Sequence, residues 1–116
     1  MATMFVAGLP IPKARPRLGR GRVYTPARTR DYQRAIWASA LAAGLRASRE
    51  PISVSLVFHL PSPGRCDLDN LIKAVLDGLK GAAYHDDRQV VRLTAEKRRA
   101  DRAHPPGVHV QIGGVA

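Results

Sequence analysis

The most regular alternation of apolar and polar positions runs from residue 52 to residue 60. A period of two predicts a strand with one face in the core. Similar but shorter alternations predict strands at residues 3–9, 91–96 and 108–112. In the first of these stretches the inward set is Ile52, Val54, Leu56, Phe58 and Leu60.

Two further stretches follow a helical period. An alanine-rich run predicts a helix over residues 26–47, with Thr25 as its N-cap and Pro26 at the first helical position. A second helix is predicted over residues 69–80, ended by Gly81. The predicted buried faces are Tyr32, Ile36, Trp37, Ala40, Leu41 and Leu45 in the first helix, and Leu71, Ile72, Val75, Leu76 and Leu79 in the second.

The predicted order is strand, helix, strand, helix, strand, strand (βαβαββ). This order favours an α/β (α+β) fold in two layers, with a small mixed four-stranded sheet and both helices packed on one face. A chain of 116 residues is long enough for one core, so we predict a single domain over residues 1–116. Residues 10–26 mix proline, glycine and cations without an apolar period, which predicts a long basic loop or ribbon.

Charge indicates the kind of partner. The chain has 19 Lys and Arg against 9 Asp and Glu, a net charge of +10. Neutralising phosphates with cations releases condensed counterions, so this balance favours a nucleic-acid partner over a merely solubilising surface. The candidate contacts to the nucleic-acid backbone are Lys13, Arg15, Arg17, Arg20, Arg22 and Arg65.

Cys66 is the only cysteine, so no intramolecular disulfide can form. No N-terminal targeting segment is recognisable, and no apolar run approaches the roughly 20 residues that cross a bilayer. We therefore expect an intracellular, cytoplasmic protein without a membrane partner.

The few acids are concentrated on both sides of the second predicted helix. Asp67 and Asp69 lie at its start, and Asp86 and Asp87 follow its end. Carboxylates are the ligands that Mg²⁺ or Mn²⁺ prefers, and no cysteine or histidine cluster has zinc spacing. Helix capping and turn formation are the alternative roles. A shared metal site requires residues 82–86 to run back along the helix, which is roughly 18 Å long.

The run DLDNLIKAVLDGL followed by DDRQVV resembles the RusA-type Holliday-junction resolvases, whose pattern is D-x-D-N-x-x-K, a helix, then D-D-x-x-V. GLPIPKARPR also looks like the opening of many phage-type members. The resemblance implies a RusA-like endonuclease domain and a homodimer. By the resemblance Asp67, Asp69 and Asp87 are the catalytic metal-binding acids, Asp86 is a supporting acid and further ligand, and Lys73 is an active-site residue near the scissile phosphate.

We therefore predict a Mg²⁺-dependent endodeoxyribonuclease, with Mn²⁺ able to substitute, that resolves four-way junction DNA by paired symmetric phosphodiester hydrolysis. The carboxylates hold the ion that activates water, and Lys73 helps to neutralise developing charge. Two alternatives stay open: a metal-dependent nuclease for other branched DNA, and a noncatalytic nucleic-acid-binding module in which the acids are caps and turns.

Overall fold

The computed structural model describes residues 2–14, 17–19, 21–24 and 26–115. Its main sheet has four strands in the order β1-β6-β4-β5. Strands β4 and β5 run parallel, whereas β6 pairs antiparallel with both β4 and β1. The predicted mixed sheet is therefore confirmed. Its strands are β1 (Ala2–Ala7), β4 (Ile52–Leu60), β5 (Val90–Arg99) and β6 (Gly107–Gly114).

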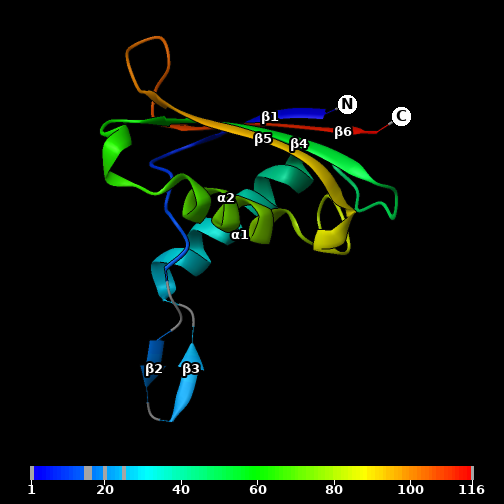
Figure 1. The fold of residues 1–116 in the computed structure, drawn as a ribbon, viewed down its shortest axis with the longest axis horizontal. Coiled ribbons are helices and arrows are strands. Elements are labelled where there is room, and N and C mark those ends of the chain that lie inside the picture. The colour runs from blue at the N-terminus through cyan, green and yellow to red at the C-terminus, as the bar shows by residue number, and fades with distance from the viewer. Residues whose placement is uncertain (1, 15–16, 20, 25, 116) are drawn as a thin grey trace.

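Both helices, α1 (Ala27–Ala42) and α2 (Leu68–Leu79), pack on one face of this sheet, as predicted (Figure 1). The basic segment forms a separate two-stranded ribbon, β2 (Arg17–Gly19) with β3 (Arg22–Tyr24), which extends away from the two layers (Figure 1). Of the predicted DNA contacts, Arg15 and Arg20 lie outside the described residues, as do the side chains of Arg17 and Arg22.

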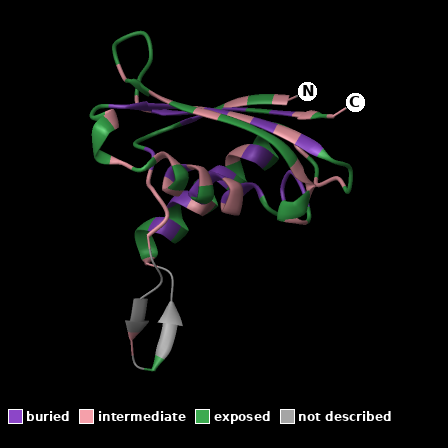
Figure 2. Cartoon of the chain, in the orientation of Figure 1, coloured by how far each residue is buried: buried purple, intermediate pink, exposed green. Residues whose placement is uncertain are grey.

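The core lies between the sheet and the helices, where Figure 2 shows the buried positions. The alternating side chains of β4 and the apolar arc of α2 meet there, and each fully buried apolar side chain contributes about 1.5–3 kcal/mol. Strand β4 is central because it pairs with a neighbour on each side. Its inward residues Val54, Leu56 and Phe58, and the helical Leu71, Val75 and Leu79, are all at most 1% exposed.

Helix α1 contacts α2 along a narrow stripe. A Cβ at Gly78 would lie 2.7 Å from the Cβ of Ile36 and 2.8 Å from the carbonyl oxygen of Gln33, so only glycine allows this approach. The prediction that Trp37 and Leu41 are buried is wrong, since they are 45% and 44% exposed. Because α1 approaches α2 so closely, only one line of α1 residues, at every fourth position, packs against α2. Trp37 and Leu41 each follow one of these positions along α1 and point to solvent. The buried line is Tyr32, Ile36 and Ala40.

The ends of α1 also differ from the prediction. The helix begins at Ala27 with Pro26 as its N-cap, and Thr25 lies outside the described residues. It ends at Ala42 and not at residue 47, because Gly44 adopts a φ of 84° that a helix cannot continue. No helix in the described ranges is both long and apolar enough to cross a membrane.

Candidate active site at the two ends of helix α2

Two of the predicted acids lie together at the start of α2. Asp67 is the N-cap residue, with φ −76° and ψ 129°, and Asp69 is in the first turn. The Asp67 side chain makes no capping hydrogen bond. Both residues are exposed, and neither forms an ion pair within the described part of the chain. Among these residues, the start of α2 therefore presents two unpaired carboxylates at the positive end of the helix dipole.

The loop before α2 is held in place by a lysine of β5. The Nζ of Lys97 donates hydrogen bonds of 2.7 Å to the carbonyl oxygens of Pro63 and Cys66, directly before Asp67. Sequence reasoning missed this residue. The sequence clue to its role was a lysine at an inward-facing position of a strand, because a partly buried cation needs nearby hydrogen-bond acceptors. In the structure Lys97 is in register with Phe58.

A cavity of about 370 Å³ opens beside Asp67. Its lining includes the cationic side chains of Lys13, Arg28 and Arg65 together with Asn70. The N-terminal segment is fixed against the helix there, because the backbone N–H of Lys13 donates to the carbonyl oxygen of Asn70 at 2.9 Å. A pocket that combines cations with a free carboxylate has the polarity required to bind a phosphate beside a metal ion.

Lys73 lies one turn after Asp69 and is exposed, with no ion pair among the described residues. It is therefore free to contact a substrate. Further along the same face, Asp77 forms an ion pair of 2.7 Å with Lys13 and accepts a hydrogen bond from Gln33 at 3.4 Å. Lys13 is thus partly neutralised within the chain, and its contact with DNA stays a prediction.

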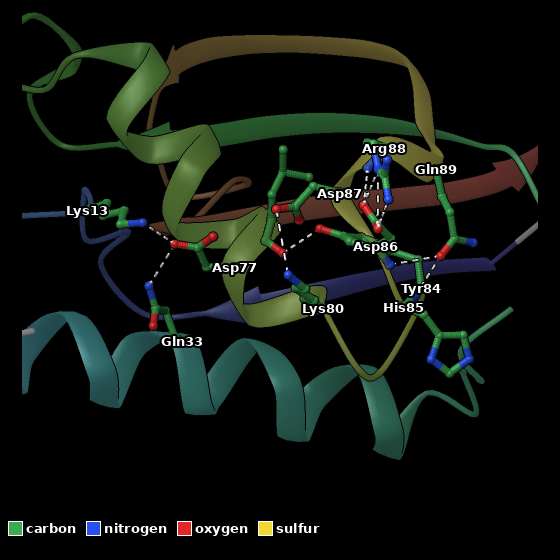
Figure 3. A network of polar contacts seen from close by, with 11 residues as sticks. Lys13, Gln33, Asp77, Lys80, Tyr84, His85, Asp86, Asp87, Arg88 and Gln89 are labelled. Carbon is green, nitrogen blue, oxygen red and sulfur yellow. Dashed lines mark hydrogen bonds and ion pairs between the residues drawn. The ribbon is translucent and has the colours of Figure 1, made fainter. Parts of the chain in front are cut away.

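The acids after α2 differ from one another (Figure 3). Asp86 caps the short 3-10 helix Asp87–Gln89: it accepts from the backbone N–H of Arg88 at 2.9 Å and pairs with its guanidinium at 3.0 Å. These hydrogen bonds lower the pKa of Asp86 to about 2. Its carboxylate is therefore ionised and engaged in holding the turn.

Asp87 is exposed, and its one ion pair within the described ranges is with the Nζ of Lys80 at 3.9 Å. The turn that carries it is anchored by Gln89, whose side-chain amide donates to the carbonyl oxygens of Ser48 and Glu50 at 2.6 and 3.0 Å. Asp87 is the available carboxylate at this end of α2.

One copy of the chain keeps these two ends apart. Strands β4 and β5 are parallel, so the chain returns along α2 between the end of β4 and the start of β5. Asp87 therefore lies just before the start of β5, whereas Lys97, near the end of β5, holds the loop that carries Asp67. A strand from Val90 to Lys97 spans roughly 23 Å, whereas magnesium–oxygen bonds are about 2.1 Å. The acids at the two ends of α2 in one chain are therefore too far apart to bind the same ion. Within the described residues, no group of three or more Asp, Glu, His or Cys side chains could hold a metal ion.

The expectation that residues 82–86 run back along the helix is wrong. Gly81 turns the chain with a φ of 90°, and Ala82, Ala83 and Tyr84 are then buried, at most 4% exposed. The Tyr84 hydroxyl donates to the carbonyl oxygen of Leu76, which ties this turn to the C-terminal end of α2. Apolar burial thus holds Asp87 at the far end from Asp67 and Asp69.

Comparison with known proteins agrees with the family that the sequence resembles. The chain is 39% identical over 80 residues to a protein of Enterobacteria phage 82 named crossover junction endodeoxyribonuclease rusA, a match that covers 65% of this chain and 64% of that protein. The chain thus spans just under two thirds of the relative's length. The family model described as endodeoxyribonuclease RusA matches residues 7–113, nearly the whole chain. This protein therefore belongs to the RusA endodeoxyribonuclease family.

Proposed function

We propose that this protein is a Mg²⁺-dependent, structure-specific endodeoxyribonuclease that resolves Holliday junctions as a homodimer. The observation that carries the proposal is the free group of Asp67, Asp69 and Lys73 at the start of α2, beside a cationic cavity. Family membership and the name of the phage 82 relative support four-way junction DNA as the substrate.

The residues at the start of α2 suit phosphodiester hydrolysis. When bound there, a divalent ion supplies Lewis-acid activation of a phosphate oxygen and of a water molecule. Asp67 and Asp69 would hold that ion with carboxylate oxygens placed at the positive end of the helix dipole. Lys73 neutralises charge that develops on the phosphate. Arg28 and Arg65, which line the adjacent cavity, position neighbouring phosphates without reading sequence.

A second copy offers a way to complete the site with Asp87. In the described part of the chain β5 pairs with β4 alone, so its outer edge is free, and its residues Val91 and Leu93 are 57% and 41% exposed. A two-fold axis across this edge pairs β5 antiparallel with its copy. Such an arrangement brings the Asp87 end of one subunit to the Asp67 end of the other. Two such sites match the two-fold symmetry of a junction cut on two strands.

The noncatalytic alternative requires the acids to be caps and turns. Asp86 has that role, since it caps the turn before β5. Asp67 stands at a cap position without making the capping hydrogen bond, and Asp69 has no partner within the described ranges. Local structure therefore leaves these two carboxylates without a structural role, which favours a catalytic one.

The test is cleavage of labelled four-way junction, flap, duplex and RNA substrates with Mg²⁺ or with a chelator. We expect cutting of the junction only with the metal. Asp69→Asn should lower the cleavage rate by roughly 100-fold or more, the scale for losing one charge-stabilising group, while junction binding persists. Asp31→Asn, the same change at an exposed position of α1, is the matched control. Cleavage that survives either the chelator or Asp69→Asn would refute the proposal.

A further inference from the structure

The only tryptophan of the chain lies exposed in a groove between α1 and α2. Trp37 is 45% exposed, although an indole is among the side chains that gain most from burial. The groove has a volume of about 230 Å³, and its lining includes Arg30, Arg34, Gly78 and Lys80. Sequence reasoning assigned this indole to the core, so its surface position needs a separate explanation.

Glycines shape the groove and place it near Asp87. Gly78 lets the two helices approach closely, since a Cβ there would lie 2.7 Å from a side-chain atom of α1, and it forms part of the groove lining. A Cβ at Gly81 would lie 3.8 Å from the Nε1 of Trp37, so the indole lies against the C-terminal end of α2. Lys80, at the same end, is 3.9 Å from the carboxylate of Asp87. The groove therefore adjoins the half-site that Asp87 contributes.

The charge of the groove is positive. Arg30 and Arg34 are exposed and form no ion pair within the described residues. The one acid of the groove, Asp77, is already paired with Lys13 at 2.7 Å. Lys80 is only loosely paired, since 3.9 Å is at the limit of an ion pair and its side chain is 52% exposed. An aromatic platform beside cations that are unpaired or only loosely paired among the described residues suits a nucleotide, whose base stacks while its phosphates meet the cations.

We propose that this groove binds an unpaired nucleotide of the DNA strand next to the cut site, with its base stacked on Trp37 and its phosphates held by Arg34 and Lys80. This proposal rests on the proposed function for the choice of branched DNA, whose strands exchange partners at the crossover and offer a base there for unpairing. A second copy of the chain is the less suitable occupant. The groove lining includes Arg30, Arg34 and Lys80, and charged residues are depleted from the centres of protein interfaces.

Because Trp37 is the sole tryptophan, its fluorescence reports the groove directly. The full chain is titrated, in the presence of a chelator that removes divalent metal, with an oligothymidylate and separately with a blunt duplex. The oligothymidylate has about 12 nucleotides, a length that suits typical single-strand sites. We expect quenching that saturates with the single strand and is weaker with the duplex. Trp37→Ala should weaken single-strand binding, measured by anisotropy of labelled DNA, roughly 5- to 100-fold, whereas Trp37→Phe keeps most of the affinity.

Leu41→Ala is the matched control, because Leu41 is 44% exposed on the same helix but does not line the groove. It should leave affinity unchanged. Binding without any change in Trp37 fluorescence would place the strand elsewhere and overturn the proposal. So would a dimer that sedimentation shows dissociating on Trp37→Ala, since the indole would then belong to a protein interface. Saturable quenching in a protein that never cleaves junctions with Mg²⁺ would instead refute the nuclease and leave the groove standing.

Discussion

The two ends of helix α2 carry the same residue type in opposite circumstances. At the start, Asp67 and Asp69 have no ion pair within the described residues, although a helix N-terminus is where aspartates usually serve as caps. At the end, Asp86 is engaged in a capping box and an ion pair with Arg88, while Asp87 beside it is exposed. The comparison teaches that the four acids divide into three available carboxylates and one structural residue.

Electrostatics separates the two ends further. Asp67 and Asp69 lie at the start of α2, where the helix dipole is positive. Asp87 lies beyond the other end, and its one ion pair within the described residues is the loose contact of 3.9 Å with Lys80. The carboxylate of Asp87 is therefore available to an additional cation. This asymmetry agrees with a site in which Asp87 of one subunit meets a metal ion held by Asp67 and Asp69 of its partner.

The largest expected effect comes from mixing two inactive variants. Asp69→Asn and Asp87→Asn should each lower the cleavage rate by roughly 100-fold or more when present alone. If Asp87 acts on the partner's site, a mixed dimer contains one intact site and one doubly altered site. After subunit exchange, an equal mixture should recover about one quarter of the wild-type sites and nick junctions on one strand. The measurement is the rate and symmetry of cutting of a labelled junction.

The matched control for that mixture is Asp67→Asn with Asp69→Asn, which alters the same half-site in both subunits. This pair should stay inactive after exchange. Failure of the Asp69→Asn and Asp87→Asn mixture to recover activity, in a sample shown to contain mixed dimers, would rule out a site shared between subunits.

A smaller effect should follow from loosening the anchor at the start of α2. Lys97→Met removes the hydrogen bonds that hold the Pro63 and Cys66 carbonyls, so the loop that carries Asp67 loses its position. We expect about tenfold slower cleavage and a higher Mg²⁺ requirement, as for other residues that orient metal ligands. Both are read from cleavage rates across a Mg²⁺ series.

Arg102→Met is the control for that change, because it removes an exposed cation from the turn after β5 without disturbing the loop that carries Asp67. An equal loss in both variants would mean that Lys97 acts only through the general positive charge of the protein.

The smallest effect lies away from both ends of α2, on the face of the sheet opposite the helices. His59 is 3% exposed, stacked on His104 at 5.1 Å and edge-on to His109 at 5.2 Å. Burial, then the charges of His109, His104 and Arg98, lower the pKa of His59, against a smaller opposing effect of Asp101. The His59 imidazole therefore binds a proton less readily in the folded state than in the unfolded state. The free energy of unfolding consequently decreases as pH falls below about 6.5.

Urea unfolding at pH 7.5 and pH 5.5 should show this as a loss of up to about 1.4 kcal/mol. In His59→Phe the difference should shrink, because the group that titrates is gone while an aromatic ring remains. An unchanged pH dependence in that variant would assign the effect to another group.

Much of the fold could be predicted from local patterns. The alternation at residues 52–60 identified the central strand, because a buried face forces a period of two. The arc of α2 and its opposite face of Asp69, Lys73, Asp77 and Lys80 were also visible, and the acidic spacing pointed to the family. The fate of Trp37 was not visible, since it depends on how closely Gly78 lets the other helix approach.

The sequence by itself determined which chemical groups this protein has and in which local elements they lie: carboxylates at both ends of one helix, a lysine one turn along it, and an excess of cations. Only the tertiary structure decided how far apart those groups lie. The parallel pairing of β5 with β4 sends the chain past the whole length of α2 between the two acidic segments. Strand direction is set by hydrogen bonds between residues distant in sequence, so no local pattern could reveal that Asp87 lies at the other end of α2 from Asp67 and Asp69.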